Sequence, residues 1–328
     1  LFPYPTLFRS GGRGHYPIKF NGSIFTVDPQ FSKTEIRFNP DWRRWGDCYW
    51  WQNTRLPYFP MTVSGDVDMI RPLFSFFKNM LPICKARAKL YFNASGAFFP
   101  ETVTIFGTYA NNDYGWDRTG HADNDIQSLW WRFVWQQGLE ILALMLDVYD
   151  HTLDSEFLSA ELIPMADAVL CYYDARFERT KTGKLIISPT QSVETYWFDV
   201  VNDTPSIAGL RSTLPRLLKL SAGNKLLYQR LLDATPDLPV IDGQILPAEK
   251  YNPERRNVEN PELYALWPFR LIGAEPLGIK TFQNRIEKAS NGWQYDGQCA
   301  AIAGLADEAK HILLSKISNS HQIGRAHV

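Results

Sequence analysis

The sequence has almost no excess of charge and no long apolar run. Its 34 Lys and Arg nearly balance its 35 Asp and Glu, which gives a formal net charge of −1. Such a chain lacks the basic surplus of proteins that bind nucleic acids or anionic membrane surfaces. Its apolar runs are also shorter than the roughly 20 residues that a transmembrane helix needs. We therefore expect neither a nucleic-acid partner nor a membrane partner.

Cysteine is scarce, with four residues that lie far apart and form no Cys-x-x-Cys pair: Cys48, Cys84, Cys171 and Cys299. This spacing predicts buried free thiols and gives neither a zinc site nor a disulfide framework. The Asp- and Asn-rich stretch 111–125 lacks the terminal glutamate of a full calcium loop. We therefore predict no metal and no cofactor.

Aromatic residues, in contrast, are abundant, with 11 Trp, 15 Tyr and 20 Phe in a chain of 328 residues that is 45% hydrophobic. This composition allows a large core, in one generous domain or two. Aromatic rings usually pack in cores, but exposed rings also form platforms for flat apolar faces such as those of sugars.

The two ends look foreign to the rest of the chain. Residues 1–10, LFPYPTLFRS, and residues 323–328, IGRAHV, resemble translated adaptor sequence at the ends of metagenomic reading frames. We exclude both from the fold prediction. The expectation that follows is a fragment, cut at both ends.

Apolar residues recur at helical spacing through most of the chain between these ends. The spacing predicts helices over 66–92, with Pro82 interrupting the first, and over 126–150. Asp154 can cap a second helix after the short connection HTLD, which makes a helical hairpin. Further helices are predicted at the ranges 207–220, 224–234, 262–271, 279–290 and 296–317. Strands are few, so the fold class is mainly α and built of hairpins.

One stretch, SPTQSVETYW over residues 188–197, places Glu194 among hydroxyl and amide groups and beside two large aromatics. Partial desolvation there would raise the pKa of Glu194, which suits a general acid. The alternative is a helix start, with Thr190 or Ser192 as the cap and Glu194 near the positive end of the helix. The residues alone favour that alternative.

Four stretches in order resemble the catalytic domain of glycoside hydrolase family 95 and its bacterial relatives, which are six-hairpin glycosidases. They are RGHYPIKFNGSIFTV near the start, WWQNTRLPYFPM over 50–61, the helix region 152–177 and the loop 188–197. A weaker match is ENPELYALWPF over 259–269. The resemblance implies an (α/α)6 toroid over 41–322, incomplete at its C-terminus. It also implies that 11–40 is a linker from a missing N-terminal β-sandwich, and that the protein is periplasmic or extracellular.

The same resemblance implies an inverting glycoside hydrolase that acts on α-L-fucosides or α-L-galactosides in oligosaccharides or polysaccharides. Glu194 is then the general acid, and Asn53 orients water or the base. The family's other asparagine corresponds to Trp51 here, and its base aspartate is expected beyond residue 328, so the fragment alone is expected to be inactive. Around this pair we predict substrate-binding residues with polar donors or aromatic faces: Trp50, Trp51, Gln52, Arg55, Tyr58, Glu101, Asp117, Tyr196, Trp197, Glu259 and Asn260.

Two other functional classes remain open from the sequence. A polysaccharide lyase on the same toroid would use Asn53, Arg55 and Tyr58 to neutralise a uronate and remove its proton, but the Glu194 loop would then have no role. A carbohydrate-binding scaffold without catalysis would bind sugar and cleave nothing.

Overall fold

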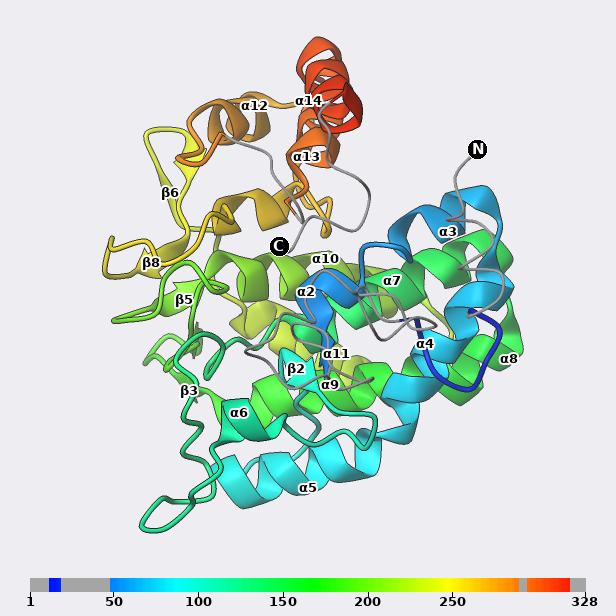
Figure 1. Ribbon diagram of the computed structural model, residues 1–328, viewed down its shortest axis with the longest axis vertical. Helices are drawn as coiled ribbons and strands as arrows, with labels where there is room; N and C mark the ends of the chain where they lie inside the picture. The colour runs from blue at the N-terminus through cyan, green and yellow to red at the C-terminus, as the bar shows by residue number, and fades with distance from the viewer. Residues whose placement is uncertain (1–11, 19–47, 289–293, 319–328) are drawn as a thin grey trace, which may run out of the picture.

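The computed structural model describes residues 12–18, 48–288 and 294–318, and the described part is mainly helical (Figure 1). Helices α7 (Gln137–Thr152) and α10 (Thr204–Lys219) pack side by side at its centre, and α10 also packs against α11 (Lys225–Ala234). The prediction of a mainly α fold is confirmed. The adaptor-like ends 1–10 and 323–328, and most of the linker 11–40, lie outside the described residues.

The first predicted helical region is two helices, α4 (Val67–Asn79) and α5 (Leu81–Phe92), which meet at Met80. Pro82 lies in the first turn of α5, where its missing N–H costs no helical hydrogen bond, so the predicted interruption is confirmed. The inner face of α4 buries Ile70, Leu73 and Phe77. Burial of each such side chain stabilises the fold by roughly 1.5–3 kcal/mol.

The helix predicted over 126–150 begins eleven residues later than expected, because α7 starts at Gln137. Gln191 binds the backbone of the preceding aromatic stretch. Its Oε1 accepts from the N–H of Phe133 at 2.7 Å, and its Nε2 donates to the carbonyl of Leu129 at 2.9 Å. Backbone groups that would close helical turns are therefore bound by a side chain 58 or more residues away.

Asp154 caps the following helix as predicted. Its Oδ1 accepts from the N–H groups of Glu156 and Phe157, both at 3.0 Å. The chain then runs through α8 (Ser155–Phe157), the short π-helix η2 (Leu158–Leu162) and α9 (Ile163–Arg176). Helix α9 packs against α7, which completes the predicted hairpin.

The remaining helices follow the predicted order, but two predicted extents are wrong. The helix predicted over 262–271 is only a short 3-10 helix, and the one predicted over 296–317 is two helices, divided where Gly304 has φ of 73°. Asp203 caps α10, and Asn224 caps α11 by accepting from the N–H of Leu227 at 3.1 Å. After these come the 3-10 helix η3 (Pro261–Ala265), α12 (Pro276–Gln283), α13 (Asp296–Ile302) and α14 (Ala306–Ser318). The short helices near the start are α2 (Trp51–Thr54), α3 (Phe59–Ser64) and α6 (Asn111–Tyr114).

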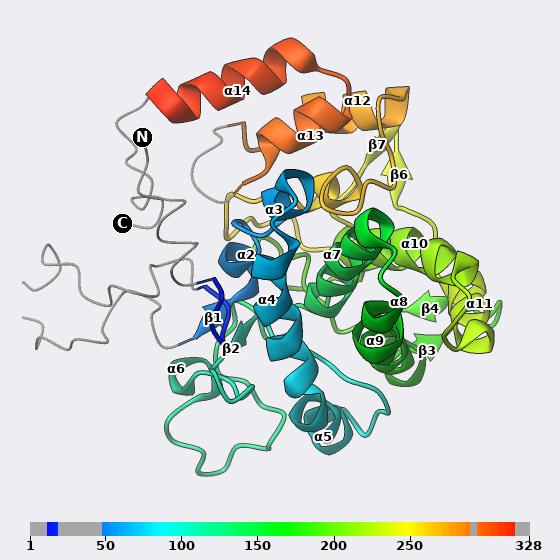
Figure 2. The same cartoon turned by 90° about the vertical axis from the view of Figure 1, so that its right-hand side faces the viewer.

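Strands are short and pair two by two, antiparallel, in the described part of the chain. The pairs are β1 (Tyr49–Trp50) with β2 (Thr102–Val103), β3 (Glu178–Arg179) with β4 (Leu185–Ile186), β5 (Val201–Asp203) with β8 (Ala248–Lys250), and β6 (Val240–Ile241) with β7 (Gln244–Ile245). They support the loops between the helices. Figure 2, turned by 90°, shows α13 and α14 at one end of the molecule and α5 at the other.

A segment ahead of these elements, residues 12–18, is fastened to the core by two tyrosines. The Tyr58 hydroxyl accepts from the N–H of Ile18 at 2.7 Å, and the Tyr49 hydroxyl donates to the carbonyl of Pro17 at 3.1 Å. Helices long and apolar enough to span a membrane do not occur among the described residues.

Candidate active site

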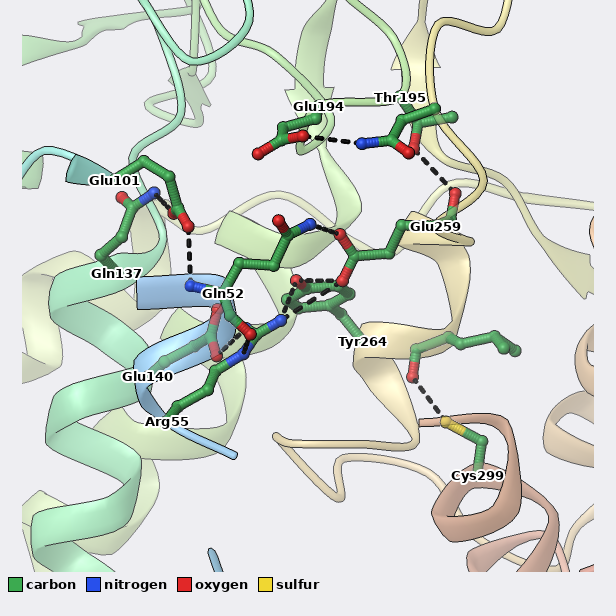
Figure 3. Close-up of polar contacts among 12 residues, drawn as sticks. Gln52, Arg55, Glu101, Gln137, Glu140, Glu194, Thr195, Glu259, Tyr264 and Cys299 are labelled. Atoms are coloured by element: carbon green, nitrogen blue, oxygen red, sulfur yellow. Dashed lines mark hydrogen bonds and ion pairs between the residues drawn. The ribbon is translucent and has the colours of Figure 1, made fainter. Parts of the chain in front are cut away.

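Five segments far apart in the sequence bring polar side chains together at the N-terminal end of α7 (Figure 3). Helix α2 supplies Gln52, Arg55 is the C-cap of that helix, and Glu101 directly precedes β2. The first turn of α7 supplies Gln137 and Glu140. The loop after β4 supplies Glu194, the loop into η3 supplies Glu259, and η3 itself supplies Tyr264.

Among the described residues, Arg55 is the cation that pairs with both Glu140 and Glu259, and it is fully buried. Its guanidinium pairs with Glu140 and donates to Glu259 at 3.3 Å. It also donates to the hydroxyl of Tyr264 at 3.0 Å and lies 4.6 Å from the ring centroid of Tyr295. Burial opposes its charge, but the carboxyls of Glu140 and Glu259 raise the pKa of Arg55, so it stays a cation.

Gln52 bridges two of the carboxyls. Its backbone N–H donates to Glu101 Oε1 at 2.7 Å, and its side-chain Nε2 donates to Glu259. Glu101 also accepts from the amide of Gln137, and Glu259 also accepts from the hydroxyl of Tyr264 at 2.8 Å. In Figure 3, Gln52 accordingly lies between Glu101 on one side and Glu259 on the other.

The carboxyls outnumber the positive charge of Arg55, so some of them hold protons near neutral pH. Burial raises the pKa of Glu101 to about 7, against hydrogen bonds from Gln137 and Gln52. Burial likewise raises the pKa of Glu140 to about 8, against the attraction of Arg55. The site can therefore supply protonated carboxyl groups in the range where most carboxyls are ionised.

The loop that carries Glu194 is a tight turn and not a helix start. Ser192 and Tyr196 exchange backbone hydrogen bonds of 3.0 and 3.3 Å around it. Thr190 does not cap a helix but donates to Asp203 at 2.6 Å, and Ser192 donates to the carbonyl of Pro247 at 2.6 Å. The helix-start alternative is wrong, because these hydroxyls bind partners across the fold. The short strand β4 ends just before this loop, at Ile186.

Glu194 itself is buried, with 6% of the residue exposed, and its two oxygens differ. Oε2 accepts from Asn257 Nδ2 at 2.7 Å, whereas Oε1 is buried and has no hydrogen-bond partner among the residues that the structure describes. Burial, together with the nearby carboxyls of Glu101 and Glu259, raises the pKa of Glu194 well above its ordinary value. Glu194 is therefore a carboxylic acid that holds its proton to higher pH than an exposed glutamate does.

Aromatic rings line the same loop. The indole N–H of Trp197 donates to the Glu194 carbonyl at 2.7 Å, and its ring meets that of Trp130 edge to face at 4.6 Å. Trp130 is 41% exposed. Tyr196 is turned inward, where its hydroxyl accepts from Arg255 at 3.0 Å. Trp197 with Trp130 thus provides the partly exposed ring surface beside Glu194, and Tyr196 supports the loop.

Three of the predicted stacking residues belong to the core. Trp51 and Tyr58 are 1% and 0% exposed, and Trp51 packs edge to face on Phe77. Trp50 is also buried and packs on Trp131. Their rings do not provide the expected stacking faces, because each is buried in the core: Trp51 in α2, Trp50 in β1 and Tyr58 at the start of α3. The spacing of aromatics in the sequence does not distinguish a packed ring from an exposed one.

The other predicted residues have mixed positions. Asn53 is buried on α2, next to Gln52. Asn260 binds the backbone of Glu287 at both ends of its amide, at 2.8 and 3.1 Å, so it holds that loop in place. Asp117 is exposed in the loop after α6, where it accepts from the N–H of Thr119 at 2.9 Å, and the contacts described for it do not reach the carboxyl network.

Four residues of the site were not predicted from the sequence: Gln137, Glu140, Tyr264 and Asn257. Glu140 had a usable signal, since an acid amid an apolar helical stripe is costly to bury without a partner. Asn257 had none, because it lies in a polar loop 63 residues from Glu194. Within the described residues, groups of three or more His, Cys, Asp and Glu with metal-binding geometry do not occur.

A family model, the glycosyl hydrolase family 95 catalytic domain, matches residues 37–213, which is more than half of the chain. A comparison with curated protein sequences finds no significant match.

Solved structures share the fold. A candidate kojibiose phosphorylase from the human microbiome aligns with a TM-score of 0.59 and 12% identity over 95% of this chain, and the chain spans 47% of that protein. A wild-type glycosidase aligns with a TM-score of 0.52 and 14% identity over 85% of this chain and 76% of its own. A variant glycosidase in complex with glucose aligns with a TM-score of 0.53 and 13% identity, over 85% of this chain and 76% of its own. At these identities the likeness shows the shared helical fold alone, and the chain spans about half the length of the first of these proteins. The closed (α/α)6 ring stays a prediction.

Proposed function

The chain belongs to the glycosyl hydrolase family 95 catalytic domain family, and on that premise we propose that it hydrolyses glycosidic bonds with inversion, using Glu194 as general acid. One observation carries the assignment of the acid. Glu194 is the buried carboxyl on the site's loops that has one oxygen anchored by an amide and the other without a partner. A group that must deliver a proton to a glycosidic oxygen needs such an arrangement, with a raised pKa and a free oxygen.

Inverting hydrolysis also needs a base that activates water on the opposite face of the sugar, with the two carboxyls roughly 6.5–9.5 Å apart. An amide cannot accept that proton, so Asn53 is proposed to orient the water or the base.

From the family resemblance we propose that the substrates are α-L-fucosides or α-L-galactosides, and that the protein acts outside the cell or in the periplasm. Trp197 and Trp130 are proposed to contact a sugar face.

The lyase alternative loses two of the groups it required. The Arg55 guanidinium is 1% exposed and bound to Glu140 and Glu259, so it is not free to neutralise a uronate. The Tyr58 hydroxyl is buried and already accepts from the N–H of Ile18. Glu194, by contrast, gains a role under hydrolysis.

The decisive experiment compares Glu194→Gln with wild type in the whole natural protein that contains this chain. The substrates are methyl and 2-chloro-4-nitrophenyl α-L-fucosides and α-L-galactosides, together with α-glucosides and uronate-containing oligosaccharides. We expect free sugar of inverted configuration by NMR. For the methyl glycoside, Glu194→Gln should lower kcat/KM by roughly 10²–10⁴-fold. The chloronitrophenyl glycoside should change much less, since its leaving group needs no proton.

Asp199→Asn is the matched control. Asp199 lies in the same loop, is exposed and has φ of 55°, a conformation that asparagine also adopts, so its kinetics should stay at wild-type values. Unsaturated products, or equal losses on both leaving groups, would reject Glu194 as general acid. Binding without any product would support the non-catalytic scaffold.

A further inference from the structure

The loop 252–259 is bound to the Glu194 loop along its whole length. The N–H of Arg256 donates to the carbonyl of Thr195 at 2.9 Å, and the hydroxyl of Thr195 donates to the carbonyl of Glu259 at 2.8 Å. The N–H of Asn252 donates to the carbonyl of Phe198 at 2.9 Å. A side chain on this loop therefore has a fixed position relative to Glu194.

Asn257 is that side chain, and its amide can face only one way. Its Oδ1 accepts from the N–H of Val258 at 2.8 Å, which leaves Nδ2 as the group directed at Glu194 Oε2, 2.7 Å away. An N–H group requires an acceptor, so Oε2 cannot be the oxygen that presents a proton along this line. The proton of a neutral Glu194 is then on Oε1, the oxygen that is buried without a partner.

We propose that Asn257 is a positioning residue for the hydrolysis, which keeps the transferable proton of Glu194 on Oε1 by occupying Oε2. The inference rests on the proposed role of Glu194 as general acid. In the acid step, Oε1–H gives its proton to the glycosidic oxygen as the C–O bond breaks. The carboxylate that results retains the Asn257 hydrogen bond on Oε2.

Two effects of Asn257 can be separated. Its hydrogen bond lowers the pKa of Glu194, as does the charge of Arg55, whereas burial, Glu101 and Glu259 raise that pKa. Loss of the bond alone should thus keep Glu194 protonated to higher pH. If Asn257 also decides which oxygen holds the proton, activity should fall even where Glu194 is fully protonated.

The test measures kcat/KM against pH for Asn257→Ala and Asn257→Asp in the same whole protein, with the methyl and chloronitrophenyl glycosides. Both variants should move the alkaline limb to higher pH and lower the plateau for the methyl glycoside by roughly 10–10²-fold, since a misplaced catalytic group costs about that much. Asn257→Asp should lose at least as much as Asn257→Ala, because the introduced carboxylate attracts the proton to Oε2. The chloronitrophenyl glycoside should change little.

Asn252→Asp is the matched control. Asn252 is in the same loop, and its Oδ1 likewise accepts from a nearby N–H, that of Glu254 at 2.9 Å. Equal pH profiles for Asn257→Asp and Asn252→Asp, with unchanged melting, would overturn the positioning role while Glu194→Gln still shows the leaving-group effect. If Glu194→Gln shows no such effect, the general-acid assignment itself has failed.

Discussion

Glu194 and Glu259 are both buried glutamates on neighbouring loops of the site, yet their carboxyls are held in different ways. Glu259 has both oxygens occupied, by Gln52 on one and by Arg55 and Tyr264 on the other. Glu194 has one amide contact and one oxygen without a partner. The first arrangement stabilises the folded state, whereas the second keeps a buried acid at a cost in stability. The difference indicates which carboxyl holds the loops together and which is available for chemistry.

The largest effect on stability is expected from Arg55→Met, which removes the cation that is bound to Glu259. Glu140 and Glu259 would be left as buried charges without compensation, and such losses cost about 3–5 kcal/mol of unfolding free energy. Since the pKa of Glu140 is about 8, the loss should be largest above that pH and smaller in acid. Urea denaturation of wild type and Arg55→Met at pH 5.5 and 9 measures the loss of stability and its dependence on pH.

Arg71→Met is the control for this loss. Arg71 and Asp154 form an exposed pair, with side chains 45% and 30% accessible, so its removal should cost less than about 1 kcal/mol. Equal losses for Arg55→Met and Arg71→Met would show that the buried network adds no stability.

Substitution by glutamine at Glu259 and at Glu194 compares the stability contributed by the two carboxyls directly. Glu259→Gln should cost roughly 2–3 kcal/mol, because it weakens the contact with Arg55 and turns an acceptor of Gln52 or Tyr264 into a donor. Glu194→Gln should stay within about 1 kcal/mol of wild type or gain stability, since its amide oxygen can still accept from Asn257. Thermal and urea unfolding of the two variants measure the difference. Similar losses at both positions would remove the basis for treating them differently.

A smaller effect tests whether an unpartnered buried oxygen is enough to mark a functional acid. Glu262 also has a buried oxygen without a partner, and burial raises its pKa to about 7. A raised folded pKa favours the protonated form, so its contribution to stability is present below about pH 4.5 and is lost as pH rises through 7. Glu262→Gln should therefore become more stable than wild type by about 1–2 kcal/mol at pH 8, and should match it at pH 4.

Activity is the second measurement on Glu262→Gln. Glu262 lies in η3 and lacks the amide anchor that Asn257 gives Glu194, so kcat/KM for the methyl glycoside should stay near wild type. A loss as large as that of Glu194→Gln would show that the anchor is not what distinguishes the acid.

Local patterns predicted the parts of the fold that depend on neighbours in the chain. The periodicity of α4, the cap at Asp154 and the interruption at Pro82 all follow from contacts within a few residues. The predicted start of α7 was wrong, because the side chain of Gln191 binds the backbone ahead of that helix. Periodicity cannot detect a competing partner that is distant in the sequence.

The sequence by itself determined that the chain is mainly helical, that its hairpins follow one another in order, and that residue 194 is a glutamate in a polar loop among aromatics. Only the tertiary structure decided that Trp51, Tyr58 and Arg55 are buried, and that Asn257 holds one oxygen of Glu194. Helix formation is governed by residues three or four apart, so a local pattern reveals it. The proton-bearing state of Glu194 depends on desolvation and on groups that folding brings together from five separate segments.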